Sequence, residues 1–92
     1  MAFIFRYHRS VKDDLEKLDN YTGSRIKKVL ETRLLVEPIN AGELLKGNLK
    51  GFRKFRVGDY RIVYKVSGNE IHILGIRHRK DIYNILENRK ES

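Results

Sequence analysis

The chain has 92 residues, no cysteine and a formal net charge of +8. This length supports a single domain, residues 1–92, with one core, and the lack of cysteine excludes disulfides and thiolate metal sites. The short apolar run at the N-terminus contains charges, so we expect no signal peptide or membrane span and a cytoplasmic protein.

The positive charge is concentrated in one segment. Residues 50–80 carry nine Lys and Arg against two acidic residues, whereas the rest of the chain is close to neutral. A localised positive block indicates a polyanionic partner, and nucleic acid is the commonest one. A membrane surface or an acidic protein is the alternative.

The N-terminal part predicts a strand followed by a helix. Apolar and polar side chains alternate over residues 2–8, which favours a strand. Ser10 stands three residues before Asp13 and is expected to cap a helix that closes at Asp19 and Asn20. The expected inward residues are Val11, Leu15 and Leu18, and the expected outward ones are Asp13, Asp14, Glu16 and Lys17.

A second helix is expected to start between residues 22 and 24 and to run to Glu37. Its apolar stripe is Ile26, Val29, Leu30 and Leu34, and Pro38 disfavours helical geometry at Glu37. Residues 39–51 contain three glycines and two asparagines, so we expect a loop with room for one helical turn near residues 43–45. The leucines of this loop are expected to close the edge of the core.

Three strands and a last helix are expected in the remainder. The strands span residues 52–57, 60–66 and 70–78, and their short connections contain glycine, which is typical of hairpins. Asp81 is a candidate cap for a helix over residues 82–89. The predicted order is β-α-α-β-β-β-α, an α+β fold with the N-terminal helical hairpin on one face of a sheet that ends in an antiparallel meander.

Strand alternation divides the meander into two faces, because successive side chains point to opposite sides. One face is expected to pack on the helices: Phe55, Val57, Tyr60, Ile62, Tyr64, Val66, His72, Leu74 and Ile76. The other is expected to form a continuous cationic trough: Phe52, Lys54, Arg56, Arg61, Val63, Lys65, Ile71, Ile73, Gly75 and Arg77. Gly75 marks either a bulge or a place where a ligand backbone approaches.

Other kinds of site find little support. No His, Asp or Glu spacing indicates a metal site, and no catalytic triad or phosphate loop is present. We therefore expect no metal and no cofactor. A DNA-binding helix-turn-helix is an alternative, since the second helix carries four cations, but such a row is more often a solvated face. His8 and His72 are expected at the edge and in the core.

Three strings carry a family resemblance that covers nearly the whole chain. They are residues 45–47 (Leu-Lys-Gly), residues 56–64 (Arg-Val-Gly-Asp-Tyr-Arg-Ile-Val-Tyr) and residues 76–83 (Ile-Arg-His-Arg-Lys-Asp-Ile-Tyr). Together they resemble the RelE/ParE superfamily of toxins. In that superfamily, RelE-type toxins are ribosome-dependent, metal-independent mRNA endonucleases silenced by a cognate antitoxin. ParE-type members share the fold but inhibit DNA gyrase.

The resemblance implies roles for four residues. Lys54 corresponds to a catalytic lysine, a candidate either for the general base or for stabilising the nucleophile. Arg61 corresponds to the arginine that stabilises the pentacovalent phosphate, and Arg77 to the one near the leaving 5′-oxygen. Tyr83 corresponds to the tyrosine that stacks on the nucleotide. The chemistry agrees, because cyclising RNA cleavage needs a base, surrounding cations and an acid, and neighbouring cations favour the neutral form of a lysine.

Further contacts with RNA are expected from the cations and the histidine around these residues: Arg53, Arg56, Lys65, His78, Arg79 and Lys80. One departure stands out, since Phe52 occupies a position where the RelE-type pattern has a second lysine. The expected partners are a cognate antitoxin, the ribosome and mRNA. A ParE-like gyrase inhibitor and a catalytically degenerate RNA-binding homologue are the alternative functions.

Overall fold

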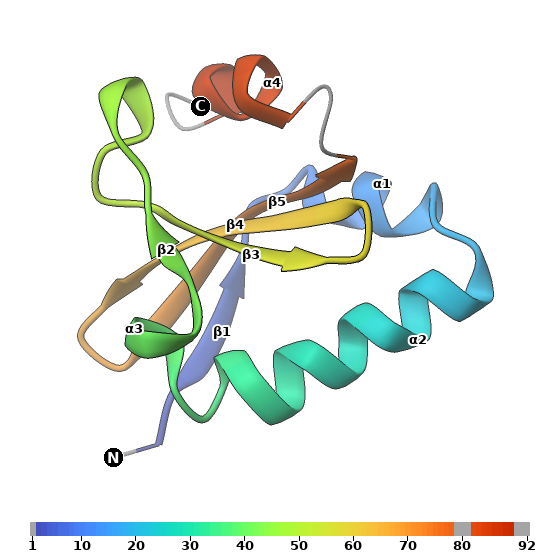
Figure 1. Cartoon of the computed structure of the whole chain (residues 1–92), viewed down its shortest axis with the longest axis horizontal. Coiled ribbons are helices and arrows are strands. Elements are labelled where there is room, and N and C mark those ends of the chain that lie inside the picture. Colours follow the sequence, from blue (N-terminus) through green and yellow to red (C-terminus); the bar gives the residue numbers. More distant parts are fainter. Residues whose placement is uncertain (1, 79–81, 90–92) are drawn as a thin grey trace.

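The computed structural model describes residues 2–78 and 82–89, which form an α+β fold around one mixed sheet (Figure 1). The sheet has the order β1-β5-β4-β3-β2. Its strands are β1 (Ile4–Tyr7), β2 (Glu43–Leu44), β3 (Arg53–Val57), β4 (Tyr60–Ser67) and β5 (Glu70–His78). Strand β1 pairs parallel to β5, and all other pairs are antiparallel. The predicted fold class and C-terminal meander are confirmed.

The helical hairpin is present, but its ends differ from the prediction. Helix α1 (Val11–Glu16) starts without a side-chain hydrogen bond from Ser10. Helix α2 (Asn20–Val29) is capped by Asp19, whose carboxylate accepts a hydrogen bond from the Thr22 amide at 2.8 Å. Asp19 therefore opens the second helix, because it is a good N-cap residue. A π-helical turn, η1 (Leu30–Leu34), extends α2.

The predicted loop over residues 39–51 contains three short elements. Pro38 starts α3 (Pro38–Ala41), where its missing N–H costs nothing, and a 3₁₀ turn, η2, spans Gly47–Leu49. Between them, β2 pairs with β3 and adds a fifth strand that the prediction lacked. Leu49 is buried and Leu45 packs beside it, but Leu44 is exposed, so only part of the expected leucine plug forms.

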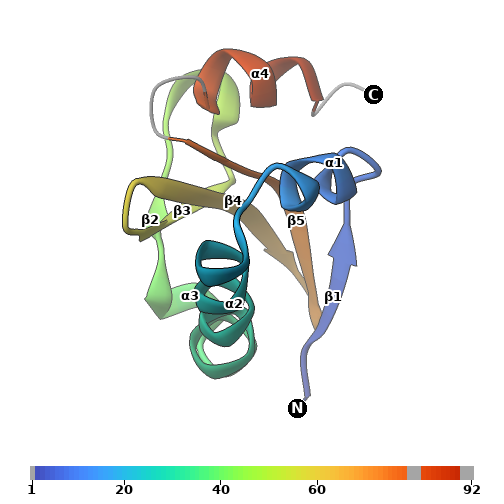
Figure 2. The ribbon, with the colours of Figure 1, turned by 90° about the vertical axis from the view of Figure 1, so that its right-hand side faces the viewer.

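The two faces of the sheet are covered by different helices. Helix α2 lies on one side of the sheet and α4 (Ile82–Arg89), whose predicted bounds are confirmed, lies on the other (Figure 2). The α2 side buries the larger cluster, which includes Ile26, Leu34 and Tyr64. The α4 side buries a smaller cluster of five residues: Leu49, Val63, Leu74, Ile82 and Leu86. This second cluster interrupts the expected trough.

A β-bulge explains why the face assignment was wrong along half of β5. Val63 pairs with Gly75 and Tyr64 with Ile73, so Leu74 is an extra residue on β5. A single extra residue reverses every side chain beyond it. Ile71 and Ile73 therefore lie in the α2-side core, and Leu74 lies on the α4 side.

Gly75 gives room to α4, not to a ligand. A Cβ atom at this position would overlap the side chain of the fully buried Leu86 and would lie 2.8 Å from Arg89 Nη1. Gly75→Ala is therefore expected to lower the free energy of unfolding by about 1–3 kcal/mol, a typical cost of overpacking. Urea denaturation followed by circular dichroism measures this change.

Gly23→Ala is the matched control for this substitution. Gly23 lies within α2, and a methyl group added there would meet no atom within 4 Å, so alanine is expected to stabilise the protein by about 0.5–1 kcal/mol. Equal stability of Gly75→Ala and the parent protein would show that α4 does not need this close approach.

Candidate functional site

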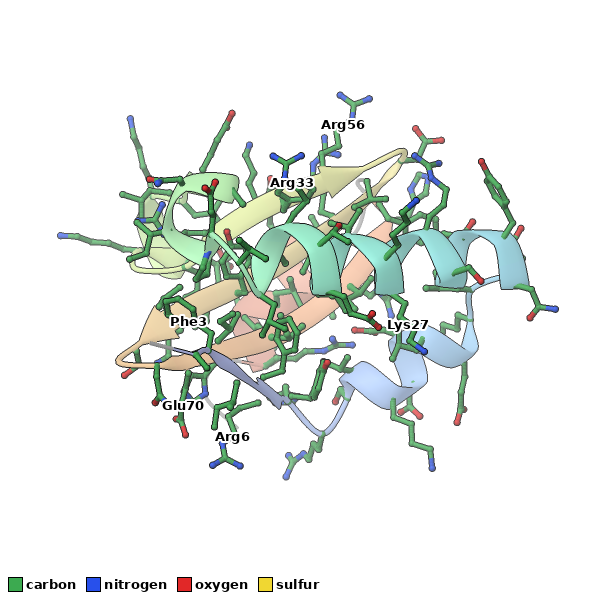
Figure 3. All side chains as sticks on the ribbon, turned by 90° about the horizontal axis from the view of Figure 1, so that it is seen from below. Phe3, Arg6, Lys27, Arg33, Arg56 and Glu70 are labelled. Carbon is green, nitrogen blue, oxygen red and sulfur yellow. The ribbon has the colours of Figure 1, made fainter. Side chains whose placement is uncertain are left out.

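Three arginines stand in one row across β3, β4 and β5, at the end of the sheet next to the β3–β4 hairpin. Arg56 of β3 is paired with Arg61 of β4, and Arg61 is paired with Arg77 of β5. Directly opposed residues share a face, and like charges in such positions repel. We call these three residues the arginine row. Val63, two residues after Arg61 on the same face, packs in the α4-side cluster, so the arginine row lies on the side of the sheet opposite α2. Arg56 extends clear of the ribbon in Figure 3. A row of this kind favours an anionic ligand.

Lys54 lies beside the arginine row on the same strand and face. Its side chain is 34% exposed, and its Nζ is 4.0 Å from Glu43 Oε2 of β2. A pocket of about 280 Å³ is lined by Ala41, Glu43, Lys54, Phe55, Arg56 and Arg61. Glu43 was not predicted as a site residue, because only the pairing of β2 with β3 places it opposite Lys54.

Arg61 has unused hydrogen-bonding capacity at this pocket. Its Nη1 atom is buried and has no hydrogen-bond partner among residues 2–78 and 82–89. Leaving a buried polar atom without a partner costs free energy, and more so for a charged group. Because this atom has almost no accessible surface, a ligand could reach it only if the side chain turned toward the pocket.

Arg77 contacts a buried carboxylate that the sequence analysis placed in solvent. Asp14 of α1 is 1% exposed, because its helix packs against β5 where β1 has ended. Its Oδ2 accepts from the Ile76 amide at 3.0 Å and from Arg89 Nη1 at 2.6 Å. Its Oδ1 accepts from Arg89 Nη2 at 2.8 Å and from Arg77 Nη1 at 3.4 Å. Asp14 thereby joins α1, β5 and α4.

These donors determine the charge state of Asp14. Burial alone would raise the pKa of this carboxyl group, but hydrogen bonds from Arg89, from the Ile76 amide and from Arg77 outweigh burial and hold the pKa below its ordinary value of 3.8. Asp14 is therefore ionised at neutral pH. Asp14 stands three residues after Val11 and four before Leu18, so helix periodicity places it on the buried face, and only its charge suggested solvent. Leu15, expected inward, is 40% exposed instead.

Two further predicted residues lie away from the arginine row. Arg53 points to the α2 side, where its Nη1 donates to the Gly42 carbonyl at 3.4 Å. His78 is paired with Tyr60, and their rings meet edge to face at 5.7 Å. The structure does not bring these residues to the pocket beside Lys54, and their contact with RNA remains a prediction.

Lys65 lies apart from Lys54, and the α4-side cluster separates the two lysines. Its Nζ is 5.5 Å from the centre of the Phe52 ring, in a separate pocket of about 250 Å³ that also includes Arg6 and His72. Arg6 and His72 both contact Glu70, at 3.0 and 3.1 Å, and Arg6 and Glu70 lie side by side in Figure 3. Phe52 packs on the α4-side cluster, which gives this departure from the toxin pattern a structural role.

Tyr83 is in the first turn of α4 and is 39% exposed, next to the buried Ile82 that anchors this turn. Its ring is accessible to a ligand. Arg79, Lys80 and the expected cap Asp81 lie outside the described residues.

Within the described ranges, no group of three His, Asp or Glu side chains is placed to hold a metal ion. None of the helices described in the structure is long and apolar enough to cross a membrane.

The sequence matches a family model over most of its length. The family is described as the ParE toxin of the type II toxin–antitoxin system, and residues 5–83 are matched. Toxin RelG of Mycobacterium tuberculosis is 29% identical over 85 residues, which cover 90% of this chain and 98% of that protein. Toxin RelE3 of Methanocaldococcus jannaschii is 33% identical over 73 residues, which cover 76% of this chain and 83% of that protein.

Solved structures show the same fold. A chain of the toxin–antitoxin complex RelBE2 from Mycobacterium tuberculosis superposes with a TM-score of 0.79 at 26% identity, covering 86% of this chain and all of that one. A mutant of toxin RelE from E. coli in the free state gives a TM-score of 0.76 at 22% identity, covering 99% of this chain and 98% of that one. This second likeness shows the fold alone. With its family match and its relatives, this chain belongs to the RelE/ParE superfamily of toxins from type II toxin–antitoxin systems.

Proposed function

We propose that this toxin is a ribosome-dependent, metal-independent mRNA endonuclease that acts in the cytoplasm. The observation that carries the proposal is the arginine row beside Lys54, in which Arg61 keeps a buried nitrogen without a partner in the described part of the chain. The relatives named RelG and RelE3 support a RelE-type activity.

The proposed reaction is attack of a ribose 2′-OH on the adjacent phosphate. A bond forms between the 2′-oxygen and phosphorus, the bond from phosphorus to the 5′-oxygen breaks, and the products end in a 2′,3′-cyclic phosphate and a 5′-hydroxyl. Lys54 takes the proton of the 2′-OH, and Arg61 binds the extra negative charge of the pentacovalent phosphate. Arg77 stabilises or protonates the leaving 5′-oxygen.

The neighbouring residues are suited to hold the RNA strand. Arg56 is more exposed than Arg61 and extends the arginine row toward solvent, where it can meet an adjoining phosphate. The exposed ring of Tyr83 can stack on a base. Glu43 Oε2 lies 4.0 Å from Lys54 Nζ and favours the ammonium form, so the entering RNA has to displace this carboxylate before Lys54 acts as a base.

An antitoxin is the expected regulatory partner. Several similar structures are toxin–antitoxin complexes, among them RelB–RelE from Methanococcus jannaschii. In this chain, a groove of about 560 Å³ between α2 and β1 is lined mostly by apolar side chains, and Tyr7 and Leu15 in it are substantially exposed. An apolar helix or extended segment of the antitoxin would cover it.

Gyrase inhibition is the second candidate, because the matching family model is described as a ParE toxin. The arginine row with Lys54 favours RNA cleavage over it. A catalytically degenerate homologue would bind RNA in a salt-dependent manner without cutting it.

Mapping of mRNA 5′ ends after brief expression separates these functions. We expect new 5′ ends within translated codons in cells that express the toxin and none in cells that express Arg77→Ala at equal level. Intact mRNA together with accumulated gyrase–DNA breaks would instead identify a gyrase inhibitor. Intact mRNA without breaks, from a protein that binds RNA, would identify a degenerate homologue.

A further inference from the structure

Asp14 is shared unequally by two arginines. Arg89 places two short, parallel hydrogen bonds on its two oxygens, 2.6 and 2.8 Å, whereas Arg77 makes a single bond of 3.4 Å. A bidentate guanidinium–carboxylate pair is much stronger than one long contact. The negative charge of Asp14 is therefore compensated mainly by Arg89.

The acceptor capacity of Asp14 is used up by these contacts. An ionised carboxylate accepts about four hydrogen bonds, and Asp14 receives four: two from Arg89, one from the Ile76 amide and one from Arg77. Arg77 is left with most of its donors unused by Asp14, and its side chain is still 19% exposed. Arg77 therefore stays in the arginine row with most of its charge available.

We propose that Arg89 is a positioning residue for Arg77: by occupying both oxygens of Asp14, it leaves the Arg77 guanidinium free to bind the phosphate of the RNA. This proposal rests on the proposed function, since it assigns Arg77 to that phosphate. Without Arg89, the buried carboxylate still needs a cation. Arg77 is already in contact with it, and would turn into a bidentate pair at the edge of the sheet.

A double substitution tests this role. Arg89→Gln removes the competing cation, so Asp14 captures Arg77 and mRNA cleavage falls on the order of tenfold. Adding Asp14→Asn to Arg89→Gln removes the carboxylate that would hold Arg77, so the double variant recovers most of the lost activity. If Arg89 only held α4 in place, the double variant would be at least as impaired as Arg89→Gln, and that result would overturn the proposal.

A second readout does not depend on activity. The Nε–Hε signal of Arg77 in a ¹H–¹⁵N NMR spectrum, assigned by its loss in Arg77→Lys, reports whether this side chain is held. Slower exchange with water in Arg89→Gln, reversed in the double variant, supports the proposal even if the protein cuts no RNA. An Arg77 signal unchanged in Arg89→Gln overturns it.

Two further variants complete the design. Lys12→Gln, at an exposed position of α1, controls for the loss of one positive charge and is expected to match the parent protein. Arg89→Lys keeps a cation near Asp14 but lacks the fork that binds both oxygens. It is expected to fall between the parent protein and Arg89→Gln, which preserves the test if the glutamine variant folds poorly. If the parent protein cleaves no mRNA at all, the proposed function fails, and the NMR comparison alone decides the role of Arg89.

Discussion

Replacement of Arg61 by alanine is expected to lower mRNA cleavage by about 10²–10³-fold, as when one transition-state donor is lost elsewhere. Arg61 occupies the middle of the arginine row and keeps a buried nitrogen without a partner among the described residues. In the proposed reaction, the Arg61 guanidinium binds the phosphate that gains charge in the transition state. Single-turnover cleavage of a programmed ribosome measures the loss.

The fold is expected to survive this substitution. Arg61 is flanked by Arg56 and Arg77, so its removal relieves repulsion, and the free energy of unfolding should stay the same or rise slightly. Arg33→Ala is a suitable control, because Arg33 is an exposed cation that lies 5.6 Å above the Phe55 ring on the α2 side. Full cleavage by Arg61→Ala would show that the arginine row is not the active site.

Sequence patterns located those elements whose ends or faces are marked by neighbouring residues in the chain. The bounds of β5 and α4 were predicted as observed, because a Ser-Gly-Asn turn precedes β5 and an apolar repeat marks α4. Strand alternation likewise placed Lys54, Arg56 and Arg61 on one face, since β3 and β4 pair without interruption. The resemblance to toxins supplied roles that alternation alone could not.

The features that were missed depend on contacts between distant segments. The bulge at Leu74 has no local signal except the adjacent Gly75, which fits two interpretations. β2 is two residues long and exists only through its pairing with β3. The second core was missed because the trough was treated as open, whereas α4 returns across it and separates Lys65 from Lys54.

Asp14 is the missed residue with the largest expected effect on stability. Asp14→Asn removes the charge that two partly buried arginines share, and is expected to lower the free energy of unfolding by about 3 kcal/mol at pH 7. Urea denaturation measures this difference. Asp13→Asn is the control, because Asp13 is an exposed neighbour in the same helix turn. Equal stability of both variants would mean that the Asp14 pairs contribute nothing net.

The effect of Asp14 should also depend on pH, with a sign fixed by its pKa. Because the pKa of Asp14 is lower in the folded state than its ordinary value of 3.8, the unfolded chain binds the proton more tightly. Its stabilising contribution is complete above that value and is lost as the pH falls through the folded-state pKa.

Glu70 and Asp19 also have lowered pKa values, the first through Arg6 and the second through Thr22. Their contribution is common to both proteins, so the stability gap between the parent and Asp14→Asn isolates Asp14. This gap should narrow below pH 4, and a gap that stays constant to pH 2 would show that the pKa of Asp14 is not lowered in the folded protein.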